Sequence, residues 1–138
     1  MKITVETRIA APIEKVWQAW NTPKDIMQWN AASDDWHTTR AEVDLKVGGK
    51  FSSRMEAKDG SMGFDFEGTY SKIVPHRLIE ATIGDRALVV EFIAGVQGGK
   101  GVTVRETFDA EDTHSIEQQR GGWQAILDRF ARHVESSQ

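Results

Sequence analysis

The stretch SIEQQRGGWQAILDRFARHV, residues 115–134, predicts one long amphipathic helix at the end of a chain that is otherwise rich in strands. Its apolar residues recur at the spacing of a single helical face, and they are Ile116, Trp123, Ile126, Leu127, Phe130 and Val134. Ser115 and Gln118 have the spacing of a capping box, which marks the start of the helix. Gly121 and Gly122 lie inside it, where each glycine costs about 1 kcal/mol relative to alanine. This pair indicates either a kink near the helix start or the close approach of a backbone or a ligand.

Before this helix, the hydrophobic pattern has the period of strands. Six segments alternate, and they cover residues 41–45, 50–57, 61–74, 78–83, 87–94 and 101–110. Short connections separate them, of which Asp59-Gly60 is the strongest turn signal and Gly98-Gly99 is the last. No helix-length pattern interrupts these segments, so they predict an antiparallel meander and not a series of βαβ units.

The first third of the chain adds one strand and two helices. Residues 2–9 alternate and predict a strand. Pro12 opens a helix with an apolar stripe, and Pro23 opens a second, short helix that ends near Trp29. The chain is then expected to run as a loop through His37. This order of elements predicts an α+β fold in which one curved antiparallel sheet wraps around the long C-terminal helix and leaves a cavity beneath it.

Length, charge and composition limit the partners. The 138 residues predict a single domain over 1–138. The 17 Lys+Arg against 21 Asp+Glu give a net charge of −4 without any basic tract, so no nucleic-acid partner is expected. No apolar run is long enough to cross a bilayer and the N-terminus does not resemble a signal peptide, so no membrane insertion is expected. Cysteine is absent, which excludes thiolate chemistry and favours a cytoplasmic location.

Several segments, in this order and over nearly the whole chain, resemble a known family. They are APIEKVWQAW, TPKDIMQW, VGGKF, FEGTYSKIVPHRLIEAT, VTVRETF and GGWQAILDRF. The chain resembles the START-like superfamily, also called SRPBCC or Bet v 1-like. Within it, the chain is similar to the bacterial AHSA1-like domain proteins, named after the activator of Hsp90 ATPase and also labelled polyketide-cyclase-like. The resemblance implies a helix-grip fold with an apolar cavity between the sheet and the C-terminal helix, but no single activity, because such folds carry many functions.

A cavity of this kind predicts a small-molecule site lined by aromatic side chains. The expected partner is a small apolar or aromatic molecule, and no cofactor is expected. The residues expected to line the cavity are Trp20, Met27, Trp29, Trp36, His37, Met55, Phe64, Phe66, Phe92, Trp123, Leu127 and Phe130. Each of the apolar residues in this set is also compatible with plain core packing, because buried apolar residues need no functional reason.

The stretch MQWNAASDDWH, residues 27–37, is interpreted as a lid at the cavity mouth. In this hypothesis Trp29 and Trp36 fold over the opening. Asp34 and Asp35 keep the loop solvated or form hydrogen bonds with its backbone. His37 is expected to be the polar group that touches a ligand, and an imidazole changes charge near neutral pH. No metal site is expected here, because the spacing matches no metal-binding motif.

Residues 61–74 leave one question of register open. If Phe64 and Phe66 point into the cavity, then Asp65 and Glu67 point out of it, and a shift by one residue reverses both pairs. Alternation along the strand does not decide between these two arrangements.

Two alternatives to simple binding follow from the same residues. A cyclase-like or lyase-like enzyme would use His37 together with a cavity carboxylate, either Glu67 or Glu106, whose pKa burial would raise. Alternatively, the interior is filled by its own side chains, and the protein acts through its surface as a stress-related or chaperone-associated partner. A homodimer is compatible with all of these readings.

Overall fold

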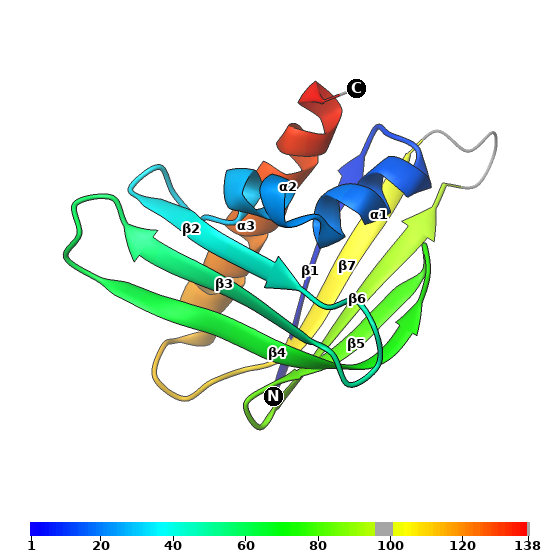
Figure 1. The fold of residues 1–138 in the computed structure, drawn as a ribbon. Coiled ribbons are helices and arrows are strands. Elements are labelled where there is room, and N and C mark those ends of the chain that lie inside the picture. The colour runs from blue at the N-terminus through cyan, green and yellow to red at the C-terminus, as the bar shows by residue number, and fades with distance from the viewer. Residues whose placement is uncertain (96–100, 138) are drawn as a thin grey trace.

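The computed structural model describes residues 1–95 and 101–137, and its elements follow the expected order of one strand, two helices, six strands and one helix (Figure 1). The elements are β1 (Lys2–Ile9), α1 (Ile13–Asn21), α2 (Pro23–Trp29), β2 (Trp36–Val43), β3 (Lys50–Ala57), β4 (Gly63–Val74), β5 (Leu78–Ile83), β6 (Arg86–Ala94), β7 (Val102–Asp109) and α3 (Ile116–Ser136). The connection expected at Gly98-Gly99 lies outside the described residues.

The seven strands form one antiparallel sheet in the order β1-β7-β6-β5-β4-β3-β2. From β2 to β7 each strand pairs with the next one along the chain, which confirms the predicted meander. The Asp59-Gly60 turn joins β3 to β4. Gly60 has φ +79°, a left-handed conformation that favours glycine, and its N–H donates to the carbonyl oxygen of Ala57 at 2.9 Å.

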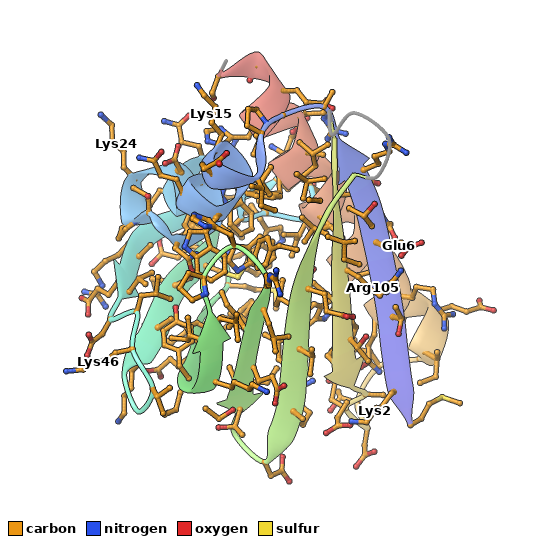
Figure 2. All side chains as sticks on the ribbon, turned by 90° about the vertical axis from the view of Figure 1, so that its right-hand side faces the viewer. Lys2, Glu6, Lys15, Lys24, Lys46 and Arg105 are labelled. Atoms are coloured by element: carbon orange, nitrogen blue, oxygen red, sulfur yellow. The ribbon has the colours of Figure 1, made fainter. Side chains whose placement is uncertain are left out.

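The helices lie on one side of the sheet. Figure 1 shows α3 running across the curved sheet, with α1 and α2 together at the end where α3 finishes. A contact between His133 Nε2 and Asp25 Oδ1 at 2.9 Å joins the end of α3 to α2. The other face of the sheet is charged: Arg105 of β7 donates to Glu6 of β1 at 2.9 Å, and Figure 2 shows both side chains on the outer side. None of the described helices has both the length and the apolar character needed to cross a membrane.

The first strand of the meander begins earlier than the sequence predicts. The pattern predicts a strand over 41–45 preceded by a loop through His37, whereas β2 starts at Trp36 and ends at Val43. The loop therefore covers only residues 30–35. Thr38 is the one fully buried residue of the described strand, and its hydroxyl donates to the Asn30 carbonyl at 2.7 Å. Polar residues occupy both faces of this edge strand, which hides the alternation on which the prediction relied.

The capping box at the start of α3 is confirmed. The Ser115 hydroxyl accepts a hydrogen bond from the Gln118 backbone N–H at 3.0 Å, and the Gln118 side chain accepts one from the Ser115 N–H at 3.1 Å. We expect Ser115→Ala to lower the free energy of unfolding by about 1 kcal/mol, because it removes the side-chain cap. Urea denaturation measures this loss. Thr113→Ala, an exposed hydroxyl two residues earlier, is the control, and an equal loss in both variants would contradict a specific cap.

Candidate functional site

A cavity of about 650 Å³ lies between the inner face of the sheet and α3, within the size range of small-molecule sites. Residues from α1, α2, α3 and strands β2 to β7 contribute to its walls. Eight aromatic side chains of the described chain line it, namely Trp20, Trp29, Trp36, Phe51, Phe64, Phe66, Tyr70 and Trp123. The lining is therefore mainly apolar, and aromatic faces make up much of it.

The aromatic rings hold one another in place at two points of the wall. Trp20 and Trp29 stack at a centroid distance of 5.0 Å, and the Trp29 indole donates to the Ala19 carbonyl at 3.1 Å. This hydrogen bond fixes the indole where α1 and α2 meet. On the opposite side, Trp123 of α3 stacks on Phe108 of β7 at 3.8 Å. Rings fixed in this way form a preformed wall, which lowers the entropy that a ligand would have to remove.

The mouth of the cavity is also aromatic. Trp36 at the start of β2 lies 5.9 Å from Phe64 of β4, measured between ring centroids, and Phe64 is 47% exposed. Exposed residues of the loop between α2 and β2, Ala32 and Ser33, line the same cavity. A ligand entering here would pass between the loop and the β3–β4 hairpin.

Glu106 places a carboxyl group in this apolar interior. It occupies the inner face of β7 between Val104 and Phe108, pairs with Val5 and Val90 on the neighbouring strands, and is 5% exposed. Within residues 1–95 and 101–137, no group forms a hydrogen bond or an ion pair with its carboxyl. Burial alone raises the pKa of Glu106 to about 8, so the side chain is mainly protonated at neutral pH.

Apart from Glu42 of β2, the remaining charged groups of the lining lie near the start of α3. Glu111 and His114 contact each other at 3.0 Å, and the hydrogen bond from His114 lowers the pKa of Glu111. Arg86, at the start of β6, donates to the Asp109 carbonyl at 3.3 Å. These groups are half-buried or exposed, so they mark a polar rim and do not neutralise the interior carboxyl.

Two buried hydroxyl groups, from Tyr70 and Ser53, also belong to the polar lining. Tyr70 of β4 is buried, and burial raises the pKa of its phenol to about 12, so the group stays neutral and is able to donate. Ser53 of β3 is buried on the same face of the sheet. With Phe51, they are lining residues that the sequence prediction omits, although each shares a strand face with a residue that it includes, Met55 or Phe66.

The structure places seven of the residues expected to line the cavity in its walls, and they are Trp20, Trp29, Trp36, Met55, Phe64, Phe66 and Trp123. Four others lie elsewhere. Met27 faces away from the cavity on α2 and is 42% exposed. Phe92 lies in the core against Trp17, at 5.0 Å between ring centroids. Leu127 and Phe130 are fully buried on the core side of α3, although Ile126, next to Leu127, lines the cavity. The apolar stripe of a helix is continuous, so spacing alone does not show where a cavity gives way to solid core.

Two of the three candidate catalytic residues lie outside the cavity, which corrects those expectations. His37 follows Trp36 in β2, so its side chain projects from the other face of the strand and is exposed. Glu67 is exposed for the same reason, because Phe64 and Phe66 point inward. The open question of register is thereby answered. Of the three candidates, Glu106 lines the cavity.

In the segment interpreted as a lid, the loop is shorter than expected, and a hydrogen bond to α3 holds it. Trp29 ends α2 and Trp36 begins β2, so both belong to regular elements. The loop between them is tied to α3, since Arg129 donates to Asp34 Oδ1 at 2.8 Å. This hydrogen bond and the charge of Arg129 lower the pKa of Asp34. Among the described residues, no group of three or more His, Cys, Asp or Glu side chains is arranged to hold a metal ion.

A curved antiparallel sheet that holds one long C-terminal helix over an apolar cavity defines the helix-grip fold of START-like proteins. The sequence matches the family described as Activator of Hsp90 ATPase homolog 1-like protein over residues 10–135. The chain belongs to this AHSA1-like family, as the sequence motifs predict.

Solved structures agree with this assignment. The solution structure of the AHSA1-like protein from Aeromonas hydrophila is 49% identical, with a TM-score of 0.89, and the match covers 99% of this chain and 94% of that one. A protein from Cytophaga hutchinsonii is 47% identical, with a TM-score of 0.81, over 99% of this chain and 93% of that one. A Chromobacterium violaceum protein, 23% identical with a TM-score of 0.84 over 98% of each chain, shares the fold. A comparison with curated proteins finds no match.

Proposed function

We propose that this protein binds a small apolar or aromatic molecule in the cavity between its sheet and α3. The observation that carries the proposal is the cavity of about 650 Å³, which eight aromatic side chains line but do not fill. Protein interiors are otherwise packed to the density of organic crystals, so a void of this size has lost dispersion contacts that a ligand would restore. The lack of cysteine fits a reducing compartment, so we propose that the protein binds its ligand in the cytoplasm. We also propose that residues 1–138 form a single domain, which contains the whole binding site.

The alternatives are less well supported. A surface-acting protein with a filled interior would have no void of this size, and the cavity therefore argues against it. A cyclase-like or lyase-like enzyme that pairs a carboxylate with His37 would need both groups in one place. The Glu106 side chain lines the cavity, whereas the His37 side chain lies exposed on the outer face of the sheet. The two groups therefore do not work as one acid–base pair.

Native mass spectrometry on protein purified without detergent tests the proposal first. We expect an added mass in the hundreds of daltons that is lost on denaturation and regained after incubation with lysate. The same spectrum reports whether the chain is a monomer or a homodimer. A bare mass in both preparations would count against a stably held ligand.

Filling the cavity from α3 is expected to block binding. Gly122 lines the cavity and an added Cβ would meet no atom within 4 Å, so its missing side chain leaves part of the void open. We expect Gly122→Leu to weaken binding of a neutral probe, the pentyl amide of dansyl, roughly tenfold or more, because the new side chain competes for the same space. Energy transfer from tryptophan to dansyl measures the affinity.

Gly121→Leu is the matched control for this substitution. Gly121 is exposed, and an added Cβ there also meets no atom within 4 Å. Both substitutions replace a helical glycine by a better helix former, so neither is expected to destabilise the fold. Equal probe affinities in the two variants would show that the probe binds elsewhere.

A further inference from the structure

Within the part of the chain that the structure describes, no group forms a hydrogen bond or an ion pair with the buried carboxyl of Glu106. Its neighbours across the sheet are Val5 and Val90, and on its own strand the inward-facing neighbours are Val104 and Phe108. A polar group left unpaired in an apolar interior costs free energy, and an ionised carboxylate costs far more. In a cavity open to a ligand, the missing partner can be supplied by the ligand.

The walls around this carboxyl favour a cation as that partner. An aromatic face carries partial negative charge and attracts ammonium and guanidinium groups, most strongly when both are removed from water. Trp123 lies against Phe108, two residues along the inner face of β7 from Glu106, and Phe66 lies 6.0 Å from Trp123 between ring centroids. A positively charged group beside Glu106 would therefore meet a carboxylate and aromatic faces together.

The charged rim also favours cations over anions. Apart from Glu106, the lining holds two carboxyl groups, from Glu42 and Glu111, against one guanidinium, from Arg86. The guanidinium lies close enough to Glu111 to lower the pKa of that carboxyl, so its charge is already balanced at the rim. An anionic amphiphile such as a fatty acid would bring its carboxylate into a cavity of like charge in a medium of low dielectric constant.

We propose that the ligand of this cavity is an apolar or aromatic molecule with a basic nitrogen, held as a cation between the Glu106 carboxylate and the aromatic wall. This inference rests on the proposed function and narrows its ligand class. The carboxyl releases its proton to solvent when the cation binds, and the resulting ion pair is enclosed by the cavity. A carboxylate paired with a cation in such a site forms the stronger, charge-assisted kind of hydrogen bond.

Three fluorescent probes of nearly equal shape test the charge preference. Dansylcadaverine carries a primary amine, the pentyl amide of dansyl is neutral, and dansyl-aminohexanoic acid carries a carboxylate. We expect the amine to bind at least about tenfold more tightly than the neutral probe, with the acid weakest, as a charge-assisted hydrogen bond implies. Glu106→Gln is expected to remove the preference for the amine, so that the amine and the neutral probe bind this variant with equal affinity.

The pH dependence of binding in the unchanged protein gives a second, independent measurement. Because ammonium binds the ionised carboxyl, amine affinity is expected to rise about tenfold per pH unit from pH 6 towards 8, while the neutral probe shows no such slope. The other titratable lining groups are Glu42, Tyr70, Arg86, Glu111 and His114. His114 is the histidine of this lining, so His114→Asn is the control and is expected to keep the slope.

The outcomes separate the two proposals. Equal affinity for all three probes, or tightest binding of the acid, overturns the basic-ligand inference but leaves a hydrophobic binding site intact. If the unchanged protein prefers the amine probe and Glu106→Gln does not, the inference is supported. If no probe binds and native mass spectrometry gives a bare mass in both preparations, the binding function itself is overturned, and the inference with it.

Discussion

Replacing Glu106 by glutamine is expected to raise the free energy of unfolding by several kcal/mol at pH 9 and by about 1 kcal/mol or less at pH 5. Burial raises the pKa of this carboxyl from 4.5 to about 8 in the folded protein. Between these values the unfolded chain has released the proton and the folded chain has retained it, so stability falls as pH rises. Above pH 8 the full loss, roughly 5 kcal/mol, is present, and glutamine avoids it because it does not ionise.

Urea denaturation at pH 5, 7 and 9 measures this effect as the difference in the free energy of unfolding between Glu106→Gln and the unchanged protein. Other carboxyl groups titrate in both proteins alike, so their contributions cancel in the difference. Glu67→Gln is the matched control, since it makes the same chemical change on the exposed face of β4 and is expected to stay within about 0.5 kcal/mol of the parent. A difference for Glu106→Gln that does not grow with pH would show that the carboxyl is ionised and solvated in the folded state.

Truncation of Phe130 is expected to be the most damaging of the aromatic substitutions around the site. The side chain is fully buried, and its ring centroid lies 5.0 Å from Trp20 and 4.8 Å from Trp29. We expect Phe130→Ala to lower the free energy of unfolding by about 3–5 kcal/mol, because it removes a packed ring and leaves a void behind both indoles. Chemical denaturation, followed by far-ultraviolet circular dichroism, measures the loss.

Phe64→Ala makes the corresponding change at the cavity mouth. Phe64 is 47% exposed, so its removal is expected to cost about 1 kcal/mol or less while altering ligand entry. The difference in stability loss between Phe130→Ala and Phe64→Ala thus distinguishes a core residue from a residue of the cavity lining. A similar cost for both would contradict the division between the packed end of α3 and the open cavity.

The main features of the fold follow from the period of the sequence. Alternation over residues 41–110 predicts the meander, and the stripe that begins at Ile116 predicts α3, since these patterns match surfaces that must be buried on one side. The family motifs add the cavity. The start of β2 is missed because His37 and its polar neighbours conceal the alternation of an edge strand.

The site is less predictable than the fold, because it depends on which buried residues meet solid packing and which meet a void. Phe92 and Trp123 have the same character in the sequence, yet one lies against Trp17 in the core and the other in the cavity wall. Glu106 is the informative exception. Glu106 has the same parity along β7 as the buried valines of that strand. Once the inner face of β7 is known, the alternation of the sequence therefore places this carboxyl inside.

The pairing of β1 with β7 has a consequence for the order of folding. Lys2 and Asp109 are partners in this ladder and lie 107 positions apart in the chain, whereas every other strand pair joins neighbours in sequence. Closing so long a loop is entropically slower than forming a hairpin, so we expect the meander to assemble first and β1 to dock last. On the ribosome, the N-terminal strand would leave the exit tunnel long before its partner exists. Until β7 is made, β1 has no ladder partner among the described strands, and that interval is when the nascent chain is most exposed to aggregation.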